Sequence, residues 1–338
     1  MKKTISCFGL IALMLIMAGC SNLHAQTPVY KVTGKIILGP ASGWDYCAVE
    51  ETTGRLFVSY QNKVTVVNIN DNTIIGEIGE QTGVHGIDFA PEFNKGFISN
   101  RDGAITIFNL TTLKKIKTVK VDGKNPDAIC YDPFSKRVFA FNHSSNNVTA
   151  IDADKETIVG TIALEGVPEF AVTDNNGKMF VNLEDKSKIT EFDPMTLKVI
   201  VSWPIAPAES PSGLAIDREN KRLFAVGDNK LMAIVDYTTG KVVAKPAIGD
   251  GPDACAYDPG TKLVFSSNGQ GTLTVIEQTS PNKYKVLSTI PTQNRARTMA
   301  VDLKTHKVFL PYSFDGDPKP GETAKTKTFA LLVLEYVK

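Results

Sequence analysis

A phenylalanine recurs seven times along this chain of 338 residues at nearly constant spacing. Successive members lie 40 to 44 residues apart, at Phe57, Phe97, Phe139, Phe180, Phe224, Phe265 and Phe309. In six of the seven cases a lysine or arginine stands two residues earlier, at Arg55, Lys95, Arg137, Lys178, Arg222 and Lys307. A repeat of this length indicates a supersecondary unit that buries its apolar faces only by stacking on copies of itself.

Each repeat unit has the sequence pattern of short β-strands. After each phenylalanine, β-branched and polar residues alternate in a second run, as in Val64–Asn68, Ile105–Asn109 and Val148–Asp152. Such alternation between Gly, Asn and Asp turns is typical of strands, and no segment has a sustained helical period. With an inner strand and an outer strand such as 158–162, each unit has the four strands of a β-propeller blade. The sequence predicts an all-β fold, a seven-bladed β-propeller over residues 30–338.

The two ends of the repeat region complement each other. The seventh unit stops after Leu331–Glu335, its third strand, whereas an unassigned strand, Val32–Ile36, precedes the first unit. We therefore expect the N-terminal strand to join the last blade and close the ring, which removes free sheet edges. The seventh unit also carries an insertion, Ser313–Glu322, with acids spaced like part of a calcium loop and prolines that favour a rigid cover over one rim.

The N-terminus has the features of a secretory signal. Lys2 and Lys3 precede an apolar run, 8–18, that is too short for a membrane-spanning helix. The sequence 17–20, Met-Ala-Gly-Cys, resembles the bacterial lipobox, in which Cys20 becomes a lipidated N-terminus. This resemblance predicts a signal peptide at 1–19, a tether at 20–29 and, because Ser21 follows, a periplasm-facing lipoprotein of the outer membrane. Ordinary signal cleavage after Ala25 is the alternative.

The repeat itself resembles a known family. Phe139–Asn142 and Val148–Asp152, followed by Thr157–Ile162, are similar to the YVTN repeat of bacterial (YncE-like) seven-bladed propellers. The resemblance covers almost the whole mature chain and implies the fold. It implies no single activity, because single-stranded DNA binding is reported within the family and related propellers include lactonases and lyases.

The start of each inner strand, here called the rim position, is polar in all seven units. The rim residues are Asp45, His85, Asp127, Glu169, Ser212, Asp253 and Arg297. Carboxylates crowded around one opening repel each other unless a cation, a proton or an arginine compensates them. We therefore predict a ligand-binding funnel in which Tyr46 and all the rim residues except Ser212 contact the ligand. Alternatively, these residues are solvated turn formers at strand ends.

A bound divalent cation is the more specific form of this prediction. Oxygen donors favour calcium, magnesium or manganese, and Asp127, Glu169 and Asp253 are the candidate ligands. Trp44 either stacks on a ligand beside Asp45 or packs between blades.

The remaining polar residues receive structural interpretations. His143 is expected in an exposed turn and His306 on the surface of the opposite rim. Glu184-Asp185 is the exception to these structural interpretations, because the repeat prefers Asn or Gly at that place. The three cysteines after the N-terminal segment are expected to be buried without disulfides, at Cys47, Cys130 and Cys255.

Three functions are compatible with these features. The first is a monomeric cell-envelope protein that binds a small polar or cationic ligand, or a partner protein, at the funnel. The second, by analogy with lactonases, is a metal-assisted hydrolase or lyase whose candidate catalytic residues are His85, Glu169 and Arg297. The third is single-stranded nucleic-acid binding, which the balance of 37 Lys and Arg against 36 Asp and Glu disfavours.

Overall fold

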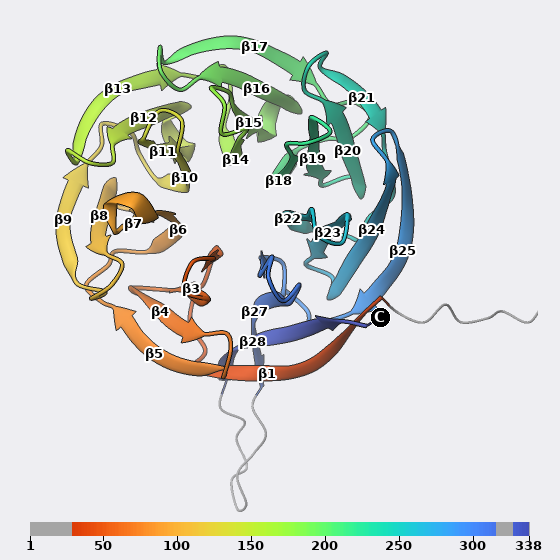
Figure 1. The fold of residues 1–338 in the computed structure, drawn as a ribbon, viewed down its shortest axis with the longest axis horizontal. Helices are drawn as coiled ribbons and strands as arrows, with labels where there is room; N and C mark the ends of the chain where they lie inside the picture. Colours follow the sequence, from red (N-terminus) through yellow and green to blue (C-terminus); the bar gives the residue numbers. More distant parts are fainter. Residues whose placement is uncertain (1–28, 316–326, 338) are drawn as a thin grey trace, which may run out of the picture.

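Seven four-stranded antiparallel sheets stand around a central axis in the computed structural model (Figure 1). The structure describes residues 29–315 and 327–337. The predicted all-β seven-bladed propeller is therefore confirmed. The predicted signal peptide, Cys20 and most of the insertion lie outside the described residues. In the part of the chain that the structure describes, no helix has the length and apolar character needed to cross a bilayer.

Blades 1 to 6 follow each other along the chain, each running from the axis outward. Blade 1 comprises β2 (Cys47–Glu50), β3 (Arg55–Tyr60), β4 (Lys63–Asn68) and β5 (Thr73–Ile78); blade 2 comprises β6 (Val84–Ala90), β7 (Lys95–Asn100), β8 (Ala104–Asn109) and β9 (Lys115–Lys120); blade 3 comprises β10 (Pro126–Asp132), β11 (Arg137–Asn142), β12 (Asn147–Asp152) and β13 (Thr157–Ala163). Blade 4 comprises β14 (Pro168–Thr173), β15 (Met179–Leu183), β16 (Lys188–Asp193) and β17 (Lys198–Pro204); blade 5 comprises β18 (Pro211–Asp217), β19 (Arg222–Gly227), β20 (Leu231–Asp236) and β21 (Lys241–Ala244); blade 6 comprises β22 (Pro252–Asp258), β23 (Leu263–Asn268), β24 (Thr272–Ser280) and β25 (Lys283–Pro291). Three short 3₁₀ helices lie in the connections, η1 (Pro91–Phe93), η2 (His143–Ser145) and η3 (Glu184–Lys186).

Blade 7 is built from both ends of the chain. It comprises β26 (Ala300–Val301), β27 (Val308–Asp315), β28 (Lys327–Tyr336) and the N-terminal strand β1 (Tyr30–Pro40). The β1–β28 ladder runs from Tyr30 opposite Tyr336 to Pro40 opposite Thr328. The predicted closure of the ring is confirmed, and the closing strand is longer than the predicted Val32–Ile36.

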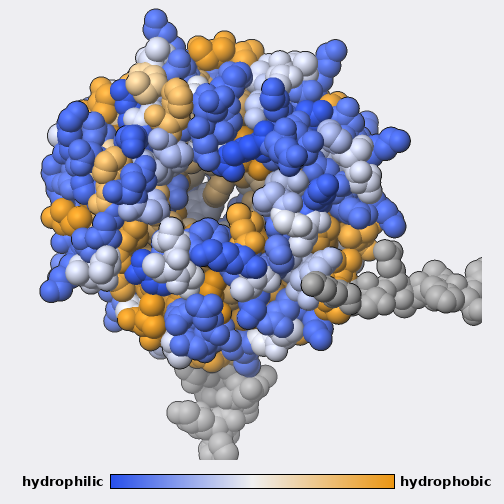
Figure 2. All heavy atoms as spheres, in the orientation of Figure 1, coloured by the Kyte–Doolittle hydropathy of each residue, from blue (hydrophilic) through white to orange (hydrophobic). Residues whose placement is uncertain are grey.

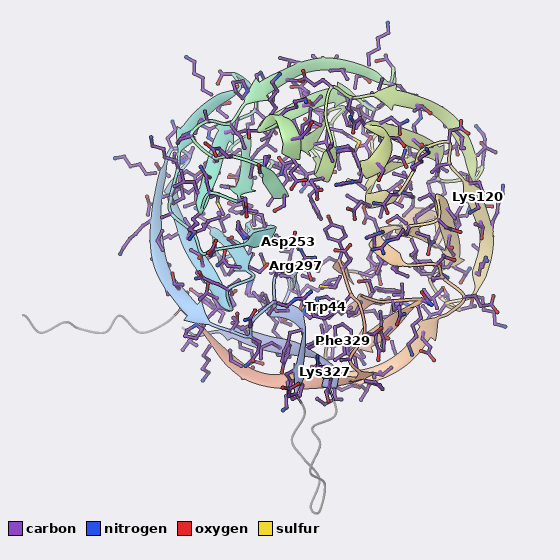
Figure 3. The ribbon with its side chains drawn as sticks, turned by 180° about the vertical axis from the view of Figure 1, so that it is seen from behind. Trp44, Lys120, Asp253, Arg297, Lys327 and Phe329 are labelled. Carbon is purple, nitrogen blue, oxygen red and sulfur yellow. The ribbon has the colours of Figure 1, made fainter. Side chains whose placement is uncertain are left out.

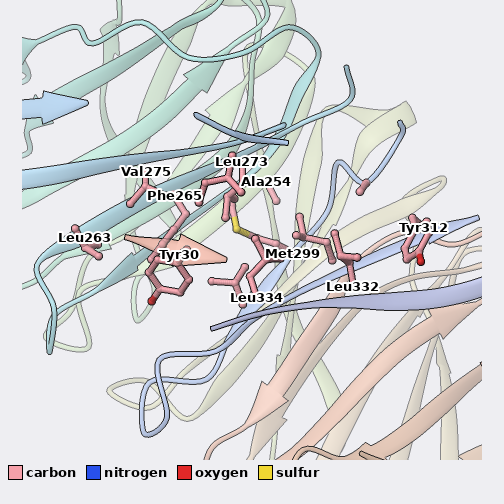
Figure 4. Close-up of a cluster of buried hydrophobic side chains, with 14 of the residues drawn as sticks. Tyr30, Ala254, Leu263, Phe265, Leu273, Val275, Met299, Tyr312, Leu332 and Leu334 are labelled. Atoms are coloured by element: carbon pink, nitrogen blue, oxygen red, sulfur yellow. The ribbon is translucent and has the colours of Figure 1, made fainter. Parts of the chain in front are cut away.

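The repeated phenylalanines form the core between the blades. All seven lie in second strands, and each is fully buried at 0% exposure. The cluster between blades 6 and 7 joins residues of β1, β23 and β28, including Tyr30, Phe265 and Leu334 (Figure 4). The phenylalanine spacing is thus the spacing of the blade interfaces.

The basic residue before each phenylalanine has a structural role that the sequence alone did not reveal. In four blades it donates hydrogen bonds to backbone carbonyls of the next blade, at the turn before the outer strand. These contacts join Arg55 to Leu110, Lys95 to Ala153 and Asp154, Arg137 to Pro194 and Met195, and Arg222 to Pro281. In these four blades, hydrogen bonds therefore join neighbouring blades in addition to the apolar packing of the phenylalanine.

The outer strands show how the exposed edges are protected. The pairing of each outer strand with its neighbour contains a register shift. In blade 2, for example, the shift lies between Ile107 and Phe108 of β8, the strand that pairs with β9. Bulges and charged residues both discourage edge-to-edge pairing. The lysines of β9 are part of this protection, because Lys120 pairs with Asp102 and Lys117 donates to the carbonyl of Glu156.

His306 and the cysteines test two further predictions. His306 is at the surface only in part: its side chain is 30% exposed, and its Nδ1 lies 2.7 Å from Oδ2 of the fully buried Asp258, across the interface of blades 6 and 7. The three cysteines are free, Cys47 and Cys130 are buried and Cys255 is half-buried, all in innermost strands.

Candidate functional site

The rim residues lie where each innermost strand begins, facing the centre of the ring. Asp253 and Arg297 mark this inner edge in Figure 3, and Figure 2 shows a hollow at the centre bordered by hydrophilic residues. Hydrogen bonds between blades fix the strand starts. Ser212 Oγ donates to the carbonyl of Pro252 at 2.9 Å, and Thr298 Oγ1 donates to that of Asp45 at 2.9 Å. Ser212 is therefore a structural link between blades.

His85 joins the acids of the blades on either side of it. Its Nδ1 lies 2.5 Å from Oδ2 of Asp45 and 3.3 Å from Oδ1 of Asp127. At the other nitrogen of the imidazole, Arg101 Nε donates a hydrogen bond to His85 Nε2 at 3.4 Å. Burial lowers the pKa of His85, but the hydrogen bond that His85 donates to Asp45 and the charges of both acids outweigh burial and raise it.

Asp127 is short of partners. Its Oδ1 is buried and receives no hydrogen bond within the described residues. Burial, followed by the charge of Asp45, raises the pKa of Asp127 to about 6. The nearest cationic group to this oxygen is His85 Nδ1 at 3.3 Å, and a buried carboxylate oxygen without a hydrogen bond is a costly arrangement that a bound cation would relieve.

Glu169 lies in a second group, with His143 and Glu184. His143 Nε2 lies 3.2 Å from Glu169 Oε1, so the expectation that His143 belongs to a simple exposed turn is wrong. The turn η2 brings its imidazole over the neighbouring blade, while Glu184 approaches from η3. Burial raises the pKa of Glu169 to about 9, with further contributions from Asp127 and Glu184.

Asp185 behaves differently from its neighbour Glu184. It accepts a hydrogen bond from the backbone N–H of Val167 at 2.7 Å and pairs with Lys186. In this exceptional dipeptide, Glu184 joins the acid group and Asp185 is a turn former.

Asp253 and Arg297 form the third pair of the rim. Arg297 Nη1 lies 3.0 Å from Asp253 Oδ2, and the guanidinium side chain is 47% exposed. Burial raises the pKa of Asp253 to about 7, although Arg297 acts in the opposite direction. One arginine does not compensate the acids that surround the opening.

Two aromatic side chains meet across the axis. The rings of Tyr46 and Phe170 lie 5.4 Å apart, although blades 1 and 4 are not neighbours in the ring. The contact therefore passes through the centre, and both side chains are half-buried there. Burial and the charges of Asp127, Asp45 and Glu169 raise the pKa of the Tyr46 phenol, so the hydroxyl stays protonated.

The predicted metal ligands do not form one compact set. Among the described residues, two groups of three bring ligand atoms within 4.8 Å of each other, and Asp127, Glu169 and Asp253 are not such a group. The two groups are Asp45–His85–Asp127 and His143–Glu169–Glu184. Each adds a histidine that the predicted set of carboxylates lacked.

Trp44 packs between blades 7 and 1. Its ring lies 5.3 Å from that of Phe329, and the guanidinium of Arg295 lies 5.9 Å from its centroid. Of the two interpretations offered for Trp44, packing is the one observed. The indole nevertheless remains half-buried at the wall of a groove.

Sequence reasoning missed Phe170, His143 and Arg101 as members of the site. Phe170 had a signal, because it follows Glu169 as Tyr46 follows Asp45, whereas the other blades have Gly, Ala or Thr at that position. His143 and Arg101 had none, because they lie in turns whose direction depends on the neighbouring blade.

Comparisons with known proteins support the fold. No family model and no curated protein matches the chain. Among solved structures, one titled Kuenenia stuttgartiensis hydrazine synthase has a TM-score of 0.70 at 16% identity, covering 81% of this chain and 92% of that chain. A structure titled mitotic checkpoint complex has a TM-score of 0.74 at 11% identity, covering 100% of both chains. Likeness at these identities shows the β-propeller scaffold alone, which hosts many functions.

Proposed function

We propose that this propeller binds a small organic cation, such as an ammonium-bearing molecule, at its central funnel. One observation carries the proposal: half-buried acids with raised pKa values surround a pair of aromatic rings at the axis. Burial is the main cause of the raised values, and repulsion between the rim carboxylates adds to it.

An organic cation suits both parts of this arrangement. Its charge would stabilise the ionised forms of Asp127, Glu169 and Asp253. The face of the Tyr46 or Phe170 ring attracts a cation within about 6 Å of its centroid. Acids alone would serve a metal equally well, so the aromatic pair favours the organic ligand.

Asp127→Asn is expected to weaken binding of a diammonium probe, putrescine, by about tenfold or more. The substitution keeps the shape of the side chain and removes its charge. Isothermal titration of the purified full chain measures the affinity. Asp228→Asn, an exposed acid of another rim loop, is the matched control and should bind as the unaltered chain does. Equal affinities of all three proteins, or no binding by any of them, would contradict the proposal.

A metal-assisted hydrolase or lyase is the second candidate. The observation that favours it is the pair of histidine-containing ligand groups. A divalent ion there would polarise a carbonyl, His85 or Glu169 would move a proton, and Arg297 would hold an anionic part of the substrate. Titration of the same proteins with Ca²⁺, Mg²⁺ and Mn²⁺ separates the candidates, because this one requires a bound ion.

We further propose that the chain works in the bacterial cell envelope as a lipoprotein anchored at Cys20. Cys20→Ala is expected to abolish incorporation of labelled palmitate and to release the protein from the membrane fraction. The substitution removes the residue that carries the lipid anchor and leaves the propeller unchanged. Cys255→Ala, a cysteine inside the ring, is the control and should leave labelling intact. Labelling that persists in the Cys20 variant would refute the anchor.

A further inference from the structure

A groove between blades 7 and 1 begins at the rim residue Arg297. Its volume is about 760 Å³. Its polar lining includes Trp44, Asn294, Arg295, Arg297, Asp315 and Lys327. Figure 3 shows Arg297 nearest the axis, with Trp44 and then Lys327 farther out, so the groove leads from the funnel toward the periphery.

Arg295 occupies a backbone position that other blades reserve for smaller residues. Two residues before the rim position, the chain adopts a positive φ, at Gly83, Asn125, Ser210 and Gly251 in four blades. Blade 7 has Arg295 there, with a φ of 67°. A long side chain in the left-handed region costs about 1 kcal/mol relative to glycine. Long side chains also adopt a positive φ at Lys136 and Lys221, so the role proposed for the Arg295 guanidinium rests on its contact with Trp44 and its place in the groove.

Trp44 is a second departure from the repeat, and it meets the first. Four blades have proline immediately before the rim position, at Pro126, Pro168, Pro211 and Pro252. Blade 1 has Trp44 there, and the Arg295 guanidinium lies over its ring. Departures from local rules gather at functional sites. Here two of them, far apart in the sequence, form one wall of the groove.

The groove carries an excess of positive charge. Arg295 and Arg297 flank Ala296, which is fully buried and so holds the segment in place. Neither Arg295 nor Lys327 forms an ion pair with any carboxylate in residues 29–315 and 327–337. Among the described residues of the lining, Asp315 is the acid, against three cationic side chains, of which Arg297 is paired with Asp253.

We propose that this groove binds an oxyanion, the carboxylate or phosphate group of a small molecule. Guanidinium groups bind such anions through paired hydrogen bonds, and Arg295 and Arg297 present two of them at the inner end of the groove. Lys327 adds a point charge at the outer end. The inference goes beyond the proposed function, because Arg295 and Lys327 lie outside the rim and the ligand has the opposite charge; Arg297 is the one rim residue that also lines the groove.

Trp44 fluorescence tests the proposal. The chain has two tryptophans, so Trp203→Phe leaves Trp44 as the reporter beside Arg295. Titration of this full-length variant with inorganic phosphate, and separately with acetate, is expected to give a saturable change at low ionic strength. Arg295→Gln and Lys327→Gln should each weaken it by about tenfold or less. A response to phosphate alone identifies a phosphorylated ligand, and a response to both anions identifies a general oxyanion site.

Lys120→Gln is the matched control for Lys327→Gln, because it removes the same charge from the outer strand β9 of blade 2, away from the groove (Figure 3). It should leave the titration unchanged. Thermal shift of the unsubstituted chain with the same anions provides a second measurement that does not depend on the tryptophan substitution. The proposal is overturned if chloride gives the same response as the oxyanions, if neither oxyanion is bound in either measurement, or if Lys120→Gln and Lys327→Gln weaken binding equally.

Discussion

Tyr30→Ala is expected to lower the free energy of unfolding by about 3–5 kcal/mol, the cost of removing a large buried aromatic side chain. Tyr30 is fully buried in β1, the strand that completes blade 7. Its ring lies 5.2 Å from that of Phe265 in blade 6, and its hydroxyl donates to the carbonyl of His306 at 2.7 Å. One side chain thus contributes to closure of the ring and to the last blade interface.

The loss has a further consequence because of where the residue lies. The other blades are continuous in sequence, whereas blade 7 depends on pairing between β1 and β28. Weakening this pairing exposes the edge of β28 and removes the contacts that keep blade 7 against blade 6. Open sheet edges favour pairing with other chains, so aggregation on heating is also expected.

Tyr336→Ala is the matched control for this prediction. Tyr336 faces Tyr30 at 5.5 Å in the same ladder but is 36% exposed. Its replacement should cost about 1 kcal/mol. Urea unfolding followed by circular dichroism measures both variants. Similar losses in the two would show that ring closure does not depend on the buried contacts of Tyr30.

The fold was predictable because its determinants are periodic. Each of the seven phenylalanines marks a second strand, and the missing strand of the last unit pointed to Val32–Ile36 as the closure. What the period did not reveal is why a basic residue precedes the phenylalanine. The target of Arg137, for example, is a backbone carbonyl of the next blade, 57 residues later. Because every residue has a backbone carbonyl, an acceptor of this kind cannot be recognised from the amino-acid sequence.

The site was predictable only as far as the repeat places it. The rim position could be located by counting strands in each repeat. Asp45, His85 and Asp127 converge because they occupy this position in three consecutive blades of a closed ring. The partner of Glu169 was misjudged because the run beginning at His143 has the composition of a solvated turn. Whether such a turn leans over the next blade depends on packing between blades, which the local sequence does not encode.

The acidic rim is expected to make stability fall as pH rises from about 5 to 8, by about 2–4 kcal/mol. The pKa values of Asp127, Asp253 and Glu169 rise on folding to about 6, 7 and 9. Between its ordinary value and its folded value, each acid keeps its proton in the native state and loses it on unfolding. Unfolding therefore releases protons and becomes easier as pH rises. The raised pKa of His85 acts in the same direction above its ordinary value.

Glu169→Gln is expected to remove a large part of this slope. The amide cannot ionise, so the variant should exceed the unaltered chain in stability at pH 8 and differ little from it at pH 5. Urea unfolding across this pH range measures the slope. Glu165→Gln is the control, because Glu165 is exposed, pairs with Lys188 and has a lowered pKa. A slope unchanged by Glu169→Gln would mean that this carboxyl is not the buried, protonated group inferred above.

The same protons connect stability to the proposed function. A cation at the funnel favours ionised Glu169 and Asp253, so binding near pH 7 should release protons and should tighten as pH rises, in the range where the empty rim loses stability. Calorimetric titration of putrescine in two buffers of different ionisation enthalpy measures the number of protons released. Glu169→Gln should reduce that number, and Glu165→Gln should not. Binding without proton release would place the ligand away from the acidic rim, even if the pH dependence of stability is as predicted.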